Sequence, residues 1–165
     1  MDAQHIIHPI PPLYDAACRI LILGSFPSIK SREAMFFYGH PQNRFWKLLA
    51  RLFNEPAPQS IEEKRNLSLR HHIAMWDVIR SCTIVGSSDS SIRDVVPNDL
   101  SEILEHSKVE RVFCNGTASF DLYRKYILPA TGIEAVKLPS TSPANAAYSL
   151  DRLAGEWARI LEYIE

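Results

Sequence analysis

The sequence has 165 residues, the length of one ordinary domain, and we expect residues 1–165 to form a single domain. Hydrophobic residues make up 46% and charged residues 22%, so the chain can bury a core and is not a disordered protein. The net charge of −1 argues against a protein that coats nucleic acid, because such binding needs many basic groups to neutralise phosphates.

Apolar runs are only a few residues long, so no segment approaches the roughly 20 apolar residues of a membrane span. The first residues lack the basic and then apolar layout of a signal peptide, and we expect a cytoplasmic protein. Cys18, Cys82 and Cys114 are too few for an iron–sulfur cluster with four cysteine ligands and show no metal-binding spacing. We therefore expect no metal and no cofactor.

Four short apolar runs are typical of buried strands: residues 20–23, 73–76, 111–114 and 134–138. Pro9, Pro11 and Pro12 indicate an irregular N-terminal lead before them. Helical patterns separate or follow the strands at residues 45–53, after the Ser60 and Glu63 capping box, near 100–104, at 118–126 and at 150–164. This alternation predicts a three-layer α/β/α fold with a four-stranded, mainly parallel sheet.

Small, polar or turn-forming residues follow each predicted strand. They are Gly-Ser-Phe-Pro-Ser at 24–28, Asp77, Asn115, and Pro-Ser-Thr-Ser-Pro at 139–143. Ligands of open parallel sheets bind beyond the carboxyl ends of the strands, so these segments should converge on one site. We expect one shared cleft lined by Ser25, Tyr38, Asn43, Asp77, Asn115 and Ser140.

Each segment taken alone also has a purely structural interpretation. Asn43 can cap the helix that begins near Arg44, and Asp77 can cap a following turn. Phe26 and Tyr38 can be core aromatic residues. The basic cluster near the site can be an ordinary solvated helix face; its members are Lys30, Arg32, Arg44, Lys47 and Arg51.

Together, and in this order, the segments resemble the uracil-DNA glycosylase superfamily. The string His-Pro-Gln-Asn-Arg-Phe-Trp at 40–46 is similar to the mismatch-specific uracil glycosylases. Four further motifs resemble the hypoxanthine-DNA (deoxyinosine) glycosylase branch: Gly-Ser-Phe-Pro-Ser at 24–28, Met-Trp-Asp at 75–77, Asn-Gly at 115–116 and Leu-Pro-Ser-Thr-Ser-Pro at 138–143. The similarity extends from about Ile20 to the C-terminal helix and implies the fold of this superfamily.

The resemblance implies a monofunctional DNA glycosylase of base excision repair, which hydrolyses the N-glycosidic bond of a deaminated base flipped out of DNA. Hypoxanthine is the expected base, with uracil and xanthine as further candidates. The motifs contain no lysine that would form a Schiff base with the sugar, so strand cleavage is not expected. The expected partner is DNA with a deaminated base. We expect a monomer that does not bind a membrane and contains no iron–sulfur cluster.

Two polar positions of the wider superfamily are apolar in this sequence. Phe26 stands where most branches position the attacking water with Asp or Asn, and Leu138 stands where they steady the leaving base with His or Asn. The resemblance then leaves Asn43 to hold the water by donating and accepting hydrogen bonds. Asp77 is a catalytic and base-reading candidate, because a carboxylate accepts from the ring N–H of hypoxanthine and repels the lone pair of adenine.

The other base-binding candidates are Ser25, Phe26, Tyr38 and Asn115, of which the two aromatic residues offer stacking faces. Candidates for contacting the DNA backbone or filling the vacated stack are Ser28, Lys30, Ser140, Thr141, Ser142, Pro143 and Ala144. The loss of two polar positions leaves a second function open, a catalytically inactive module that binds damaged or single-stranded DNA in the same pocket. A third, favoured only by the near-neutral charge, is a small-molecule-binding α/β domain.

Overall fold

Four parallel strands form the central sheet in the order β3–β2–β6–β7. They are β2 (Ile20–Gly24), β3 (Ile73–Asp77), β6 (Arg111–Asn115) and β7 (Ala135–Leu138). The predicted four-stranded parallel sheet is confirmed, and each strand differs from its predicted bounds by one residue. The computed structural model describes residues 2–164, so Met1 and Glu165, the ends of the predicted domain, lie outside the described residues.

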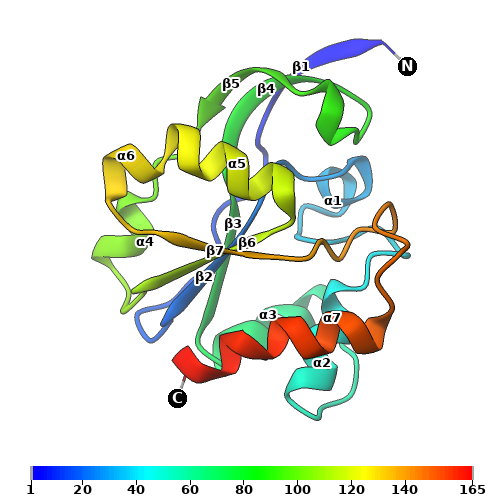
Figure 1. The fold of residues 1–165 in the computed structure, drawn as a ribbon, viewed down its shortest axis with the longest axis vertical. Coiled ribbons are helices and arrows are strands. Elements are labelled where there is room, and N and C mark those ends of the chain that lie inside the picture. Colours follow the sequence, from blue (N-terminus) through cyan, green and yellow to red (C-terminus); the bar gives the residue numbers. More distant parts are fainter. Residues whose placement is uncertain (1, 165) are drawn as a thin grey trace.

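Helices cover both faces of this sheet, which confirms the three-layer α/β/α fold (Figure 1). One layer contains α2 (Phe45–Leu52), α3 (Ile61–Arg70) and α7 (Leu150–Trp157). The other contains α4 (Ser101–Glu105), α5 (Thr117–Tyr126) and α6 (Leu128–Thr131). The remaining helical segments are α1 (Ile29–Ala34), η1 (Asp89–Ser91) and η2 (Ala158–Tyr163), the last of which continues α7 as a tighter 3₁₀ turn.

Alternate side chains of the central strands enter opposite cores. Ile20 and Ile22 of β2 pack with the layer of α2, α3 and α7. Leu21 and Leu23 pack on the other face, against α4, α5 and α6. All four side chains are fully buried, which is why the strand appears in the sequence as a continuous apolar run rather than an alternating one.

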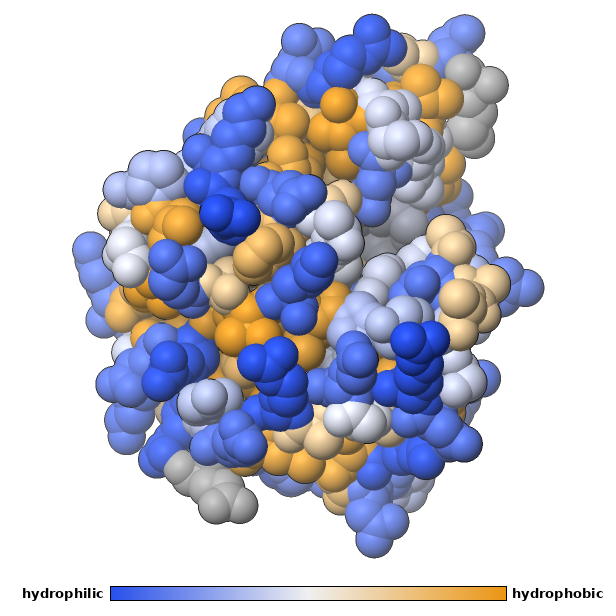
Figure 2. Space-filling model, viewed as in Figure 1, coloured by the Kyte–Doolittle hydropathy of each residue, from blue (hydrophilic) through white to orange (hydrophobic). Residues whose placement is uncertain are grey.

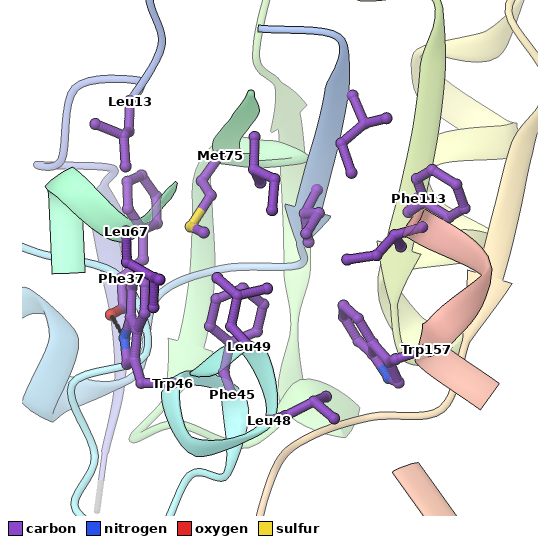
Figure 3. Close-up of a cluster of buried hydrophobic side chains, with 14 of the residues drawn as sticks. Leu13, Phe37, Phe45, Trp46, Leu48, Leu49, Leu67, Met75, Phe113 and Trp157 are labelled. Carbon is purple, nitrogen blue, oxygen red and sulfur yellow. Dashed lines mark hydrogen bonds between the residues drawn. The ribbon is translucent and has the colours of Figure 1, made fainter. Parts of the chain in front are cut away.

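The core beneath α2 and α7 is built around large aromatic side chains (Figure 3). Trp157 is fully buried, and its ring meets that of Phe45 edge to face with the centroids 5.8 Å apart. Its indole N–H donates to the Pro139 carbonyl at 2.9 Å. This bond ties the C-terminal helix to the segment that leaves β7, at the carboxyl edge of the sheet.

A second, antiparallel sheet was absent from the prediction. It consists of β1 (Ala3–Ile7), β4 (Ile79–Val85) and β5 (Arg93–Pro97) in the order β1–β4–β5. The predicted N-terminal lead is irregular at Pro9, Pro11 and Pro12, but the residues before it form β1, which pairs along the whole of its length with β4. Because β4 begins just after β3 ends, the second sheet starts at the carboxyl edge of the first.

The surface in the view of Figure 2 carries hydrophobic side chains in separate areas among hydrophilic ones. Within residues 2–164, no helix has the length and apolar character needed to cross a membrane. Cys18, Cys82 and Cys114 are free thiols buried in the protein. Their buried positions agree with a packing role.

The Trp157 hydrogen bond leads to a stability prediction. Trp157→Phe keeps an aromatic ring in the core but leaves the Pro139 carbonyl without a donor. We expect a folded variant whose free energy of unfolding, measured in urea, is lower by about 1–3 kcal/mol. Tyr163→Phe changes a side chain that is 37% exposed and serves as the control, with an expected change below about 0.5 kcal/mol. An equally small effect of Trp157→Phe would show that the bond contributes no stability.

Candidate active site

A cavity of about 320 Å³ opens at the carboxyl edge of the central sheet. Every central strand contributes to its wall, through Gly24 of β2, Asp77 of β3, Asn115 of β6 and Ser140 just after β7. Ligands of open parallel sheets bind at this edge, and the volume lies at the lower end of the range for small-molecule sites.

The residues that the sequence placed in one cleft all border this cavity: Ser25, Tyr38, Asn43, Asp77, Asn115 and Ser140. Other expected site residues border it too: Phe26, Ser28, Thr141, Ser142, Pro143 and Ala144. Lys30 is not part of the cavity wall, and its exposed ammonium group lies 3.6 Å from the Glu33 carboxylate on α1. Leu138 also does not reach the cavity, because it is 1% exposed and packs in the core.

Asn43 is held by two hydrogen bonds to its side-chain carbonyl. Oδ1 accepts the Phe45 backbone N–H at 3.0 Å, at the start of α2, and the Thr141 hydroxyl at 2.8 Å. These bonds use both lone pairs of Oδ1, whereas Nδ2 has no partner among the described residues. Asn43 therefore binds the first backbone N–H of α2 and offers the cavity a donor only. This corrects the expectation that its amide both donates to and accepts from a water.

Thr141 is the centre of a buried network. Its Oγ1 accepts from Asn115 Nδ2 at 3.0 Å, and its backbone N–H donates to Asn115 Oδ1 at 3.0 Å. The expectation that Thr141 binds a phosphate is wrong, because the side chain is fully buried and its hydroxyl proton is donated to Asn43. Both ends of the Asn115 amide are bound to Thr141, so Asn115 joins β6 to the loop after β7.

Arg44 fixes the same loop from another side. Its guanidinium donates to three backbone carbonyls, those of Ser142 at 2.9 Å, Asn145 at 3.0 Å and Tyr148. Two further members of the basic cluster are bound within the protein, Arg32 to a backbone carbonyl and Arg51 to a carboxylate. The cluster therefore serves internal contacts more than it forms a phosphate-binding face.

Asp77 is buried at the cavity wall, and His8 from the segment after β1 holds one of its oxygens. His8 Nε2 lies 2.7 Å from Asp77 Oδ2, and the two side chains are 2% and 6% exposed. His8 Nδ1 accepts the Ile10 backbone N–H at 3.2 Å, so the ring proton is on Nε2 and His8 donates to Asp77. Asp77 Oδ1 has no hydrogen-bond partner among the described residues. Asn98 fixes the backbone by donating to the Asp77 carbonyl at 2.8 Å.

Gly24 at the end of β2 makes room for this carboxylate. A Cβ atom at Gly24 would lie 2.4 Å from Asp77 Oδ1, closer than non-bonded carbon and oxygen atoms approach. The adjacent strands β2 and β3 pair Gly24 with Asp77, which explains the close approach. The glycine of the first motif is therefore required by the position of the carboxylate.

The two aromatic candidates differ in how they meet the cavity. Tyr38 stacks on Phe45, with the centroids 4.1 Å apart and the rings 21° from parallel, which leaves its other face for the cavity. Its φ of 54° lies in the left-handed region, which is unusual for a bulky residue. Burial raises the pKa of Tyr38, the charge of Asp77 adds to this shift, and a side-chain hydrogen bond with Asn115 opposes it. Phe26 is only 9% exposed, with the Arg32 guanidinium 5.6 Å from its ring centre.

Sequence reasoning missed His8 and Asp89. Asp89 lies in the hairpin between β4 and β5, borders the cavity and accepts the Ser25 hydroxyl at 2.7 Å. Burial of its carboxyl group raises the pKa of Asp89; the Ser25 hydrogen bond opposes this shift, and the charge of Asp77 adds to it. A hairpin signal was present for Asp89, since Gly-Ser-Ser-Asp at 86–89 separates two apolar stretches. No comparable pattern marks His8.

The polar groups of the cavity suit hydrogen bonding and proton transfer. The described part of the chain contains no group of three or more His, Cys, Asp or Glu side chains arranged to hold a metal ion. No lysine is among the described residues that border the cavity. A fixed carboxylate oxygen, an amide donor and a second carboxylate can bind a planar polar molecule and accept a proton from water.

Comparison with known proteins shows the family of the chain. Residues 11–162 match the family model described as the uracil DNA glycosylase superfamily. A relative from Methanosarcina acetivorans, named hypoxanthine DNA glycosylase, is 34% identical over 93% of this chain and 96% of its own length. One of the same name from Methanosarcina barkeri is 36% identical over 90% of this chain and 93% of its own length.

A solved structure supports the same relationship. The solution NMR structure of a Methanosarcina acetivorans protein, provisionally named a uracil DNA glycosylase, superposes with a TM-score of 0.79 at 34% identity. The superposition covers 96% of this chain and 100% of the other. On this agreement of sequence and fold, the chain belongs to the uracil DNA glycosylase superfamily.

Proposed function

We propose that the protein is a monofunctional DNA glycosylase that hydrolyses the N-glycosidic bond of hypoxanthine in DNA. The observation that carries the proposal is the fixed acceptor Asp77 Oδ1 in the cavity at the carboxyl edge of the sheet. Hypoxanthine presents a ring N–H beside a carbonyl, whereas adenine has a lone pair at that nitrogen. The names of the two Methanosarcina relatives support hypoxanthine as the base. Uracil and xanthine carry the same N–H and remain further candidates.

The base has to leave the duplex to reach this cavity. The free face of Tyr38 provides a surface on which it can stack, an interaction worth roughly 1–3 kcal/mol. Pro143 and Ala144 are exposed at the rim, where they can fill the gap left in the base stack. The hydroxyls of Ser140 and Ser142 accept local backbone N–H groups and keep their own protons for DNA phosphates.

Hydrolysis requires a water molecule at the sugar carbon. In the proposed reaction, the glycosidic C–N bond breaks and its electron pair moves to the base, while the sugar becomes oxocarbenium-like. The Asn43 amide donates to the water and holds it, and its fixed rotamer makes it the main water-positioning group. As the C–O bond forms, the Asp89 carboxylate accepts the water proton. The departing base anion takes up a proton from solvent, so the products are an abasic site and the neutral free base.

The direct test uses duplexes with a single inosine, uracil or xanthine. After incubation, abasic sites are revealed by alkaline cleavage. The proposal expects them in the inosine duplex and an intact strand before alkali. Tight binding of the inosine duplex without abasic sites would favour a catalytically inactive DNA-binding module. Absence of both binding and excision would favour a small-molecule-binding domain.

The role of Asn43 is separable from its helix cap. Asn43→Asp keeps an acceptor for the Phe45 N–H but loses the donor, and Asn43→Ala loses both. We expect each variant to lower single-turnover excision of hypoxanthine by about 10²–10³-fold. Thermal or urea unfolding should show a loss of about 1 kcal/mol for the alanine variant alone. If Asn43→Asp excises at nearly the parent rate, Asn43 is a cap and not the water-positioning residue.

Asp77→Ala tests base reading. Contacts to base edges determine which base is bound, whereas contacts to phosphates position the DNA. The Asp77→Ala variant should therefore lose more base selectivity than general DNA affinity. We expect the preference for an inosine duplex over an undamaged duplex, from measured dissociation constants, to fall about 10-fold or more. Ser142→Ala removes a hydroxyl proposed to bind phosphate and should weaken the binding of both duplexes equally. The same uniform weakening in Asp77→Ala would make Asp77 a structural residue.

Asp89 gives the reaction a pH dependence. Its pKa is raised, and the protonated acid cannot accept a proton from water, so excision should slow as the pH falls through a value above the ordinary range for aspartate. Asp89→Asn should be slower by about 10²-fold or more and lose this acidic limb. Asp94→Asn, whose carboxylate accepts the Thr83 hydroxyl at 2.8 Å on the same hairpin, is the control. An unchanged pH profile in Asp89→Asn would exclude Asp89 as the proton acceptor.

A further inference from the structure

His8 and Asp77 form a buried pair that the proposed reaction does not use directly. His8 directly follows β1 of the second sheet and Asp77 ends β3 of the central sheet, 69 residues later in the sequence. The His8 ring is packed edge to face against Phe26 and Trp76, with centroid distances of 5.8 Å and 6.0 Å. These ring contacts and the hydrogen bond to Asp77 fix the position of the His8 ring.

The pair divides the two oxygens of Asp77 between the protein and the cavity. His8 is absent from the described cavity wall, whereas Asp77 borders it. Oδ2 accepts the His8 N–H and is therefore on the side away from the cavity. Gly24 leaves space for Oδ1, which has no hydrogen-bond partner among residues 2–164. The cavity thus receives one carboxylate oxygen, not two.

A single acceptor distinguishes two bases that are otherwise alike. Guanine and hypoxanthine share the carbonyl and the ring N–H, but guanine carries an additional amino group next to that N–H. A carboxylate with two free oxygens accepts both neighbouring donors in a two-pronged arrangement, as it does from a guanidinium. With Oδ2 bound by His8 away from the cavity, the guanine amino group finds no second acceptor on Asp77. A buried donor left unpaired is strongly unfavourable.

We propose that His8 makes the cavity selective for hypoxanthine over guanine by occupying the second oxygen of the Asp77 carboxylate. This inference rests on the proposed function, because it takes Asp77 as the residue that reads the base. His8 acts through Asp77 and is a positioning residue. Because His8 binds one oxygen, the carboxylate can accept only the ring N–H of a base and not an additional amino group.

The test compares single-stranded oligonucleotides that contain one inosine or one guanosine and no other guanine. Single strands remove the difference in base-pair strength between the two. The measured quantity is the ratio of single-turnover excision rates for inosine and guanosine. His8→Leu fills the space without a donor, which frees the carboxylate to rotate and offer both oxygens. We expect the ratio to fall by about 5- to 150-fold in this variant.

His8→Gln is the matched control, because its amide can donate to Oδ2. His8→Gln should retain most of the parent ratio of inosine to guanosine excision rates. If His8 served only in packing, restoring the hydrogen-bond donor would not restore this ratio. An unchanged ratio in a folded His8→Leu variant overturns the proposal. If His8→Leu does not fold, the parent protein still decides, since excision of guanine as fast as hypoxanthine would overturn it. Excision of neither base by the parent protein instead contradicts the proposed function.

Discussion

The hydroxyl group of Thr141 is the shared partner of two motifs that are far apart in the sequence. It accepts a hydrogen bond from Asn115 at the end of β6 and donates one to Asn43 before α2. Because Thr141 is fully buried, the loss of either partner would leave a polar group without a hydrogen bond. Satisfying this one side chain brings three segments together and turns the Asn43 amide donor toward the cavity.

The second sheet brings the carboxylates of Asp77 and Asp89 to their hydrogen-bond partners. Its strand β4 continues from β3 and pairs with β1, so that His8 reaches Asp77 and the hairpin tip brings Asp89 to Ser25. Asp77 and Asn43 then share a design in which one polar atom is bound to the protein and the other is free. Fixed groups of this kind lose little entropy when they bind a ligand, and they keep reacting atoms aligned. In the proposed function, a protein of near-neutral charge can in this way bind its ligand through a few well-placed hydrogen bonds.

The sheet and the position of the cavity were predictable because both follow from local patterns. Buried parallel strands appear as short apolar runs, and the residues that follow them meet at one edge. The pairing of His8 with Asp77 and of Ser25 with Asp89 spans 69 and 64 residues, and such contacts leave no local spacing in the sequence. Thr141 was misread for a related reason. Loop hydroxyls are usually exposed, and only the packing of Asn43 and Asn115 around Thr141 buries this one.

The central claim is that the cavity holds the extruded base with its ring N–H on Asp77 Oδ1. The most direct measurement is a crystal structure of the Asn43→Ala variant bound to a duplex with one deoxyinosine whose sugar carries a fluorine that blocks cleavage. The account predicts the base inside the cavity, with its N1 atom about 2.7–3.2 Å from Asp77 Oδ1 and His8 still bound to Oδ2. A hypoxanthine that stays stacked in the duplex, or that turns its N1 atom away from Asp77, would contradict it.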